Sequence, residues 1–190
     1  MATFTDFDRR AMARAIELAE KGATTAHPNP RVGCVIAKDE QIIAEGWHER
    51  AGGPHAEVMA LRALASGAGL MAAHGSTVYV TLEPCSHHGR TPPCSDALVN
   101  ARVARVVFAI PDPDPKVAGR GVVTLSQAGI KVDMGLMEAE AEELNIGFLK
   151  RMRKGTPYVR VKVGMSLDGR TALANGTSKW ITSEAAREDV

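Results

Sequence analysis

The order of apolar and polar residues along the first 154 positions predicts alternating helices and strands. Apolar side chains recur at helical spacing in residues 7–21, 55–66, 95–100, 122–127 and 138–153. Short apolar runs rich in β-branched residues predict strands at residues 32–37, 41–47, 77–82, 104–110 and 130–133. At the first helix, Asp6 is placed to cap the start and Gly22 to end it.

The connections between these segments indicate an α/β fold with a mixed sheet. The polar turn at residues 38–41 would join two strands as an antiparallel hairpin. The strand at 104–110 follows a helix, so we expect it to run parallel to the strand before it. Gly129 is a helix stop ahead of the last strand. We therefore expect a three-layer α/β/α domain with a mixed central sheet over residues 1–154.

The segment Gly-Thr-Pro at residues 155–157 is the expected domain boundary. Beyond it, residues 158–163 alternate as a strand, and the Asp-Gly and Asn-Gly pairs at 168–169 and 175–176 predict turns. A further helix is expected to begin at a Ser183 cap.

Composition narrows the function classes. The chain has 190 residues, of which 45% are apolar and 24% charged, as is ordinary for a globular protein. A net charge of +1 and an aromatic content of 4% argue against a nucleic-acid partner, and no apolar run could span a membrane. Three cysteines and no secretory signal at residues 1–14 suggest a cytoplasmic protein, with Cys34 as a packed core residue.

The chemistry is expected around Cys85, Cys94 and His55. Two thiolates and one imidazole form a donor set suited to Zn²⁺, and three protein ligands leave the fourth tetrahedral position for water, as in catalytic zinc sites. The strand at 77–82 would deliver Cys85 to the carboxyl edge of the sheet, where ligands bind in α/β folds. Cys94 would lie at a helix N-terminus, where the helix dipole favours a thiolate.

Glu57 is the expected proton carrier. It would take a proton from water and hand it to a leaving nitrogen, and His-x-Glu followed by Pro-Cys…Cys is typical of zinc deaminases. Eight residues separate the two cysteines instead of the usual two, and this insertion carries His87, His88 and Arg90. In the alternative, a closed structural site, His87 or His88 would be a fourth ligand and Glu57 would be incidental.

Several motifs together resemble the bifunctional deaminase/reductase family of riboflavin biosynthesis. The motifs lie at residues 27–30, 46–48, 54–57 and 81–94, and residues 162–170 and 178–182 look like the opening of the reductase. The resemblance covers the whole chain. It implies a cytidine-deaminase-like fold for residues 1–154. Residues 155–190 would then be the incomplete N-terminal part of a reductase domain with a dihydrofolate-reductase-like fold.

The resemblance also implies an activity. The chain would be a zinc-dependent hydrolase that removes the 2-amino group of 2,5-diamino-6-(5-phosphoribosylamino)pyrimidin-4-one as ammonia. Asn29, His48, His87 and Arg90 match substrate-binding positions of the family, and Arg90 would also help to hold the phosphate. On residue type alone, Asn29 could equally be a turn residue and His48 a solvated loop residue.

The reductase of this family uses NADPH. By resemblance, Gly164 and Trp180 match cofactor contacts, Ser178 a substrate contact and Lys162 an active-site position. Residues 155–190 are too few to bury an independent core, so we expect this chain to deaminate without binding NADPH or reducing. Deaminases of the superfamily are commonly oligomeric, and a homo-oligomer is therefore one expected state.

Other interpretations remain open at this point. A guanine or cytidine deaminase of the same superfamily would be expected to have a short Cys-x-x-Cys, which is absent here. A binding module with a purely structural zinc is another possibility. Two polar segments have simple structural interpretations: Asp112 and Asp114 as turn residues between prolines, and the basic residues at 150–154 as a solvated helix end.

Overall fold

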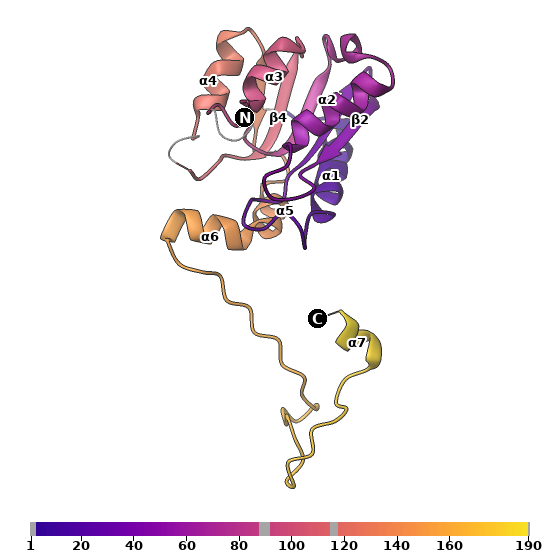
Figure 1. Cartoon of the computed structure of the whole chain (residues 1–190), viewed down its shortest axis with the longest axis vertical. Helices are drawn as coiled ribbons and strands as arrows, with labels where there is room; N and C mark the ends of the chain where they lie inside the picture. Colours follow the sequence, from indigo (N-terminus) through magenta and orange to yellow (C-terminus); the bar gives the residue numbers. More distant parts are fainter. Residues whose placement is uncertain (1–2, 88–91, 115–117, 190) are drawn as a thin grey trace. The chain divides into compact units, whose positions relative to one another are not determined.

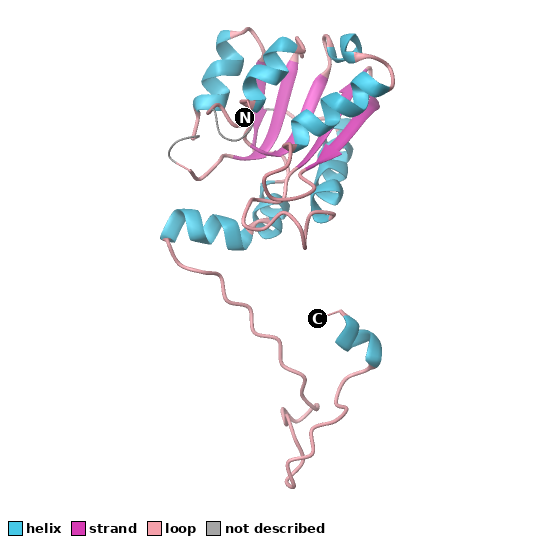
Figure 2. Cartoon of the chain, in the orientation of Figure 1, coloured by secondary structure: helices cyan, strands magenta, loops and turns pink. Residues whose placement is uncertain are grey.

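In the computed structural model the chain forms two units. A mixed sheet lies at the centre of the larger unit. The structure describes residues 3–87, 92–114 and 118–189, and the units are Met1–Pro157 and Tyr158–Val190. In the described residues the sheet has five strands in the order β2-β1-β3-β4-β5. Figure 2 shows the strands in magenta and the helices in cyan. The strands are β1 (Gly33–Lys38), β2 (Gln41–Trp47), β3 (Thr77–Leu82), β4 (Arg105–Ile110) and β5 (Lys131–Met134). β1 is antiparallel to β2, and β3 is parallel to β4, as predicted. The structure also pairs β1 antiparallel with β3 and β4 parallel with β5.

Helices cover both faces of the sheet (Figure 1). One face packs against α2 (Ala56–Ser66), α3 (Cys94–Asn100) and α4 (Arg120–Gln127). The other packs against α1 (Asp6–Glu20) and α5 (Glu138–Leu144), followed by α6 (Ile146–Lys154). A short 3-10 helix, Leu70–Ala73, precedes β3 and was not predicted. The predicted three-layer α/β/α architecture is confirmed.

The strands are apolar throughout because both faces of the sheet are covered. Val35 pairs with Tyr79 and faces α1, whereas the next pair, Ile36 and Val78, faces α2. The helices also approach the strands closely. A Cβ atom on Gly33 would lie 1.9 Å from the carbonyl oxygen of Ala15, so only glycine allows α1 to pack here.

The start of α1 differs from the prediction. Asp6 is not the cap. Thr5 is the N-cap residue, and its side chain accepts a hydrogen bond from the backbone N–H of Asp8, while Asp8 accepts one from the backbone N–H of Thr5. This reciprocal capping box satisfies two helix-end donors at once, which Asp6 alone could not do. It also turns the Asp8 side chain into the protein, where it is 2% exposed.

The prediction of one continuous helix over residues 138–153 is wrong. The helix breaks at Asn145 into α5 and α6. The side chain of Asn145 is buried, accepts a hydrogen bond from the backbone N–H of Arg31 at 2.8 Å and donates one to the carbonyl of Arg31 at 2.8 Å. These bonds pair Asn145 with a distant loop, and the apolar pattern gives no sign of them.

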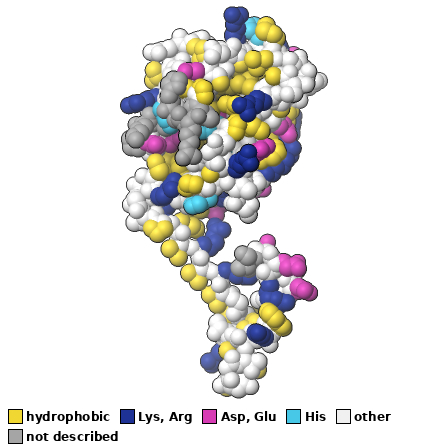
Figure 3. All heavy atoms as spheres, in the orientation of Figure 1, with side chains coloured by type: hydrophobic (Ala, Val, Ile, Leu, Met, Phe, Trp, Pro, Cys, Tyr) yellow, Lys and Arg dark blue, Asp and Glu magenta, His cyan; other side chains and the backbone are white. Residues whose placement is uncertain are grey.

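In the unit Tyr158–Val190, the strand predicted at residues 158–163 is wrong. The backbone there forms no ladder with any described segment, and a strand requires a partner. Hydrophobic side chains along this segment are exposed, with Val159 at 70% and Val161 at 77%. Figure 3 shows hydrophobic side chains, in yellow, on the surface of this unit. Helix α7 (Glu184–Glu188) begins at Ser183 as predicted, and the Ser183 hydroxyl accepts a hydrogen bond from the N–H of Ala186. No helix in the described part of the chain is long and apolar enough to cross a bilayer.

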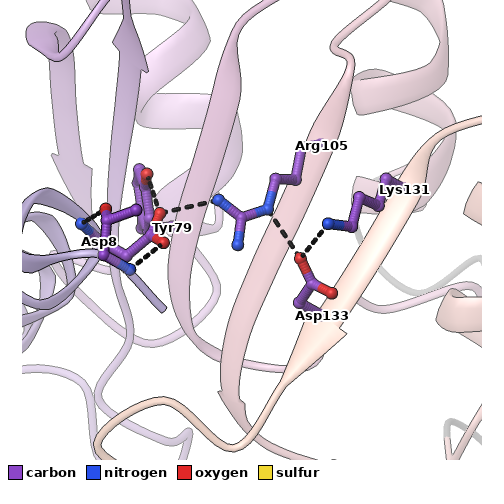
Figure 4. Close-up of polar contacts among 6 residues, drawn as sticks. Asp8, Tyr79, Arg105, Lys131 and Asp133 are labelled. Atoms are coloured by element: carbon purple, nitrogen blue, oxygen red, sulfur yellow. Dashed lines mark hydrogen bonds and ion pairs between the residues drawn. The ribbon is translucent and has the colours of Figure 1, made fainter. Parts of the chain in front are cut away.

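A partly buried ion-pair network joins α1 to three strands of the sheet (Figure 4). Arg105 on β4 lies 2.7 Å from Oδ1 of Asp8 and 2.7 Å from Oδ2 of Asp133 on β5. The hydroxyl of Tyr79 on β3 donates to Asp8 at 2.7 Å. Burial by itself would raise the pKa of Asp8, but the hydrogen bonds from Tyr79, Thr5 and Arg105 together lower it below the ordinary value. The ionised carboxylate therefore stabilises the fold.

Replacing Asp8 with Asn should lower the free energy of unfolding by about 2 kcal/mol near pH 7, because Arg105 loses one of its charged partners. A carboxyl group whose pKa is lowered by folding stabilises the folded protein at pH values above its ordinary pKa of 3.8. This stabilisation is lost as the pH falls through the lowered pKa of the folded state. The difference between the two proteins should therefore shrink towards about pH 3. Denaturant unfolding at both pH values measures this. Asp6→Asn, at an exposed position of the same helix start, is the control, and an equal effect from both variants would contradict the assignment.

Candidate metal centre

Three side chains from separate parts of the chain meet at one edge of the sheet. His55 is the N-cap residue of α2, Cys85 follows β3, and Cys94 is the first residue of α3. The Nδ1 atom of His55 lies 3.2 Å from Sγ of Cys94 and 3.5 Å from Sγ of Cys85. All three donor atoms lie within 4.8 Å of one another, which is close enough to hold one metal ion.

The loop after β3 is tied down at several points. The backbone N–H of Glu83 donates to the carbonyl of Ile110 at the end of β4, and the N–H of Ser95 donates to the carbonyl of Cys85. The Glu83 carboxylate accepts hydrogen bonds from the backbone N–H groups of Asp112 and Gly119. Cys85 is therefore positioned by bonds to the loop after β4 and to the start of α3.

The two thiols cannot both ionise easily without a cation. The hydrogen bond from Cys94, with a smaller effect of His55, lowers the pKa of Cys85 to about 4. The same contact, together with burial, raises the pKa of Cys94 well above its ordinary value. The pair thus favours a single negative charge, and a second thiolate needs a neighbouring cation. One imidazole nitrogen and two sulfurs fit zinc in number and softness.

Glu57 lies beside this group on the first turn of α2. It is 3% exposed and lines the same pocket as His55 and Cys85. Burial, followed by the charge of Cys85, raises the pKa of Glu57 to about 7. A carboxyl group with this pKa can both accept and release a proton near neutral pH.

Asn29 and His48 form a second polar pair in the pocket. The Nδ1–H group of His48 donates to the carbonyl of Pro54 at 3.0 Å, which leaves Nε2 to accept from the Asn29 amide at 3.0 Å. Burial lowers the pKa of His48, so the ring is neutral, and it packs edge-on to the ring of His55. His48 is 3% exposed, and the interpretation of it as a solvated loop residue is therefore wrong.

The pocket has a volume of about 370 Å³ and belongs to the unit Met1–Pro157. Its predicted lining residues are Asn29, His48, His55, Glu57, Cys85 and His87. The lining residues that the sequence interpretation missed are Pro30, Val32, Leu82, Glu83, Asp112, Asp114, Phe148, Arg151 and Met152. Predicted residues His88 and Arg90 lie outside the described residues.

Three of the missed residues had been given structural interpretations that do not involve the pocket. Asp112 and Asp114 were interpreted as turn residues, although they follow β4 at the carboxyl edge where ligands gather in α/β folds, and this position was the available signal. Burial and the charges of Asp114 and Glu83 raise the pKa of Asp112 to about 6. Arg151 was interpreted as part of a solvated helix end, but it lines the pocket because the break at Asn145 redirects α6.

The predicted reductase residues lie in the unit Tyr158–Val190. Ser178 and Trp180 line one hollow of about 230 Å³, and the guanidinium carbon of Arg187 lies 4.1 Å from the centre of the Trp180 ring. Lys162 donates to the carbonyl of Ala186 at 3.0 Å. Gly164 does not line this hollow, and neither does Lys162.

Comparison with known proteins gives a consistent result for most of the chain. Residues 5–110 match the family model "Cytidine and deoxycytidylate deaminase zinc-binding region", and residues 157–190 match the RibD C-terminal domain. The riboflavin biosynthesis protein RibD of Escherichia coli K12 is 63% identical over 183 residues, which are 96% of this chain and 48% of that protein.

Two solved structures are similarly close. Form 1 of Acinetobacter baumannii RibD matches with a TM-score of 0.87 and 60% identity, over 96% of this chain and 50% of that one. The second structure, from Thermotoga maritima, is a diaminohydroxyphosphoribosylaminopyrimidine deaminase/5-amino-6-(5-phosphoribosylamino)uracil reductase. It matches with a TM-score of 0.90 and 42% identity, over 96% of this chain and 52% of that one. The chain thus spans about half the length of these relatives.

Substituting Gly121 by Ala tests how the loop after β3 is held. A Cβ atom at Gly121 would lie 2.1 Å from the carbonyl oxygen of Pro84, next to Cys85. We expect a loss of about 1–3 kcal/mol in unfolding free energy and weaker zinc binding, since the backbone beside a ligand must move. Denaturant unfolding and chelator competition measure the two effects. Val123→Ala, at an exposed position of the same helix, is the control, and unaltered zinc affinity in Gly121→Ala would contradict the coupling.

Proposed function

Because the chain belongs to the cytidine and deoxycytidylate deaminase zinc-binding family, we propose that it deaminates 2,5-diamino-6-(5-phosphoribosylamino)pyrimidin-4-one hydrolytically in riboflavin biosynthesis. The observation that carries the proposal is the His55, Cys85 and Cys94 cluster with the buried carboxyl of Glu57 in the same pocket. The names and identities of the relatives support the choice of substrate over cytidine or guanine.

In this proposal His55, Cys85 and Cys94 would hold the zinc ion. When bound there, zinc would supply Lewis-acid chemistry, which lowers the pKa of water. The closed structural alternative requires a fourth Cys or His. Among the described residues, the cluster of potential metal ligands at this edge contains these three and not His87.

Glu57 moves the protons of the reaction. Its carboxylate accepts a proton from the attacking water, whose oxygen bonds to the ring carbon that carries the 2-amino group. Glu57 then delivers protons towards the ring and the departing nitrogen. The carbon–nitrogen bond breaks, a carbonyl group remains, and ammonia leaves. Glu57 is 3% exposed, so few bulk water molecules compete with the reacting groups for its carboxylate.

Asn29, His48 and His87 bind the substrate. The Asn29 amide is oriented by its hydrogen bond to His48, and His48 is oriented by the carbonyl of Pro54, so the polar groups that meet the ring are held before it arrives. His87 lines the same pocket. Arg90 remains a predicted substrate residue.

We assign residues 1–154 to the deaminase domain and residues 155–190 to the N-terminal part of a reductase domain. The match of residues 157–190 to the RibD C-terminal domain supports the second assignment. In that domain Gly164 and Trp180 would contact NADPH, Ser178 the substrate, and Lys162 would be an active-site group. That this chain does not itself bind NADPH, and that it forms a homo-oligomer, remain predictions. A cytoplasmic location is supported by the thiol chemistry of the cluster, which requires reduced cysteines.

Replacing Glu57 with Gln should lower the rate of ammonia release by roughly 100- to 10,000-fold while zinc content stays unchanged, because the amide cannot carry the proton. Ammonia release and metal content are measured on the same purified sample. Glu49→Gln, at an exposed position before α2, is the matched control and should keep full activity. Undiminished turnover by Glu57→Gln would remove Glu57 from the mechanism.

Replacing Cys85 with Ser should reduce zinc below about one ion per chain, since a hydroxyl is a poor replacement for a thiolate ligand. Metal analysis after dialysis against a weak chelator provides the measurement. The control is Cys34→Ala, because Cys34 is fully buried in the core and does not belong to the group of candidate ligands. Equal zinc retention by both variants would mean that Cys85 is not a ligand.

A further inference from the structure

Helix α6 contributes one face to the pocket. Phe148, Arg151 and Met152 all line it, and residues spaced by three and four positions lie on the same side of a helix. Asn145 sets the direction of that face through its two hydrogen bonds to the backbone of Arg31. The backbone N–H of Leu149 in turn donates to the carbonyl of Asn145. The position of Arg151 is therefore determined by the fold.

Charge along the pocket is uneven. Glu57, Glu83, Asp112 and Asp114 contribute carboxyl groups to its lining. Among its described lining residues, Arg151 is the one lysine or arginine. A phosphate group would be repelled by the carboxylates and attracted by the guanidinium, so the electrostatics favour one orientation for a ligand that has a phosphate at one end.

The Arg151 side chain is held but has hydrogen-bonding capacity to spare. One terminal nitrogen donates to the carbonyl of Pro28 at 3.0 Å, and the guanidinium carbon lies 5.7 Å from the centre of the Phe148 ring. Within the described residues, Arg151 forms no ion pair with a carboxylate. A guanidinium group has five N–H donors in a planar fork that matches phosphate oxygens. The exposed position of Arg151 places these donors at the mouth of the pocket.

We propose that Arg151 binds the phosphate group of the substrate and makes the deaminase selective for the phosphorylated compound. This inference rests on the proposed function, which supplies the phosphate. The pyrimidine ring lies at the end with Glu57 and His55, and the ribosyl phosphate extends towards α6. Pro28 adjoins Asn29, so the phosphate contact and the ring contact share one loop.

Selectivity is tested with two substrates, the phosphorylated compound and the same compound without its phosphate. Arg151→Met removes the charge and keeps a long apolar stem against Phe148. The ratio of kcat/KM for the phosphorylated over the dephosphorylated substrate should fall roughly 10- to 100-fold, as expected for loss of a charge-assisted hydrogen bond. Arg151→Lys keeps the charge but lacks the planar guanidinium group, so it should lower this ratio less than Arg151→Met.

Arg153→Met is the matched control on the same helix. Arg153 forms an ion pair with Glu142 at 2.7 Å and does not line the pocket, so its removal should leave the ratio unchanged. Titration calorimetry with the deaminated product, with and without its phosphate, is the second measurement. Arg151→Met should weaken binding of the phosphorylated product selectively.

The outcomes separate this inference from the proposed function. Suppose that the wild-type chain deaminates the phosphorylated substrate and Arg151→Met changes kcat/KM equally for both substrates. The phosphate role of Arg151 is then overturned, while the deaminase assignment stands. If the wild-type chain deaminates neither compound with zinc present, the proposed function itself fails. An equal change of the ratio in Arg151→Met and Arg153→Met would indicate a general charge effect and would also overturn the specific contact.

Discussion

The meeting of His55, Cys85 and Cys94 within 4.8 Å is the constraint on which the rest of the larger unit depends. It requires the end of β3 and the starts of α2 and α3 to converge at one edge of the sheet. Parallel β3 and β4 bring their carboxyl ends together, and the bond from Glu83 to Ile110 ties the two loops. A cation in the cluster would stabilise this convergence, because two thiolates at this separation repel each other.

Burial divides the pocket into parts with different roles. At the inner end, Glu57 and His48 are almost completely shielded from water, and their pKa values shift in opposite senses for the same reason: burial disfavours the charged form of each. At the mouth, Arg151 is exposed and stays in contact with solvent. The inner end suits proton transfer, and the mouth suits attraction of an anion.

Asn145 connects the fold to the pocket. Its side chain forms the same pair of hydrogen bonds with Arg31 that a neighbouring strand would form, and it does so at a helix break. Two segments that lie 114 positions apart in the sequence are joined there. Since an unpaired buried amide would cost about 1–3 kcal/mol, this contact specifies the direction of α6 strongly.

The sequence by itself determined most of the secondary structure, the mixed α/β architecture and the residues of the metal cluster. It could do so because buried strands, amphipathic helices and ligand-type residues are local properties of the chain. Only the tertiary structure decided that Thr5 and not Asp6 caps α1, that α5 and α6 are separate, and that Asp112 and Arg151 line the pocket. Each of these features depends on where a distant segment lies, because hydrogen bonds, burial and charge act between residues that are close in space. The spacing of residues within one segment does not encode such contacts.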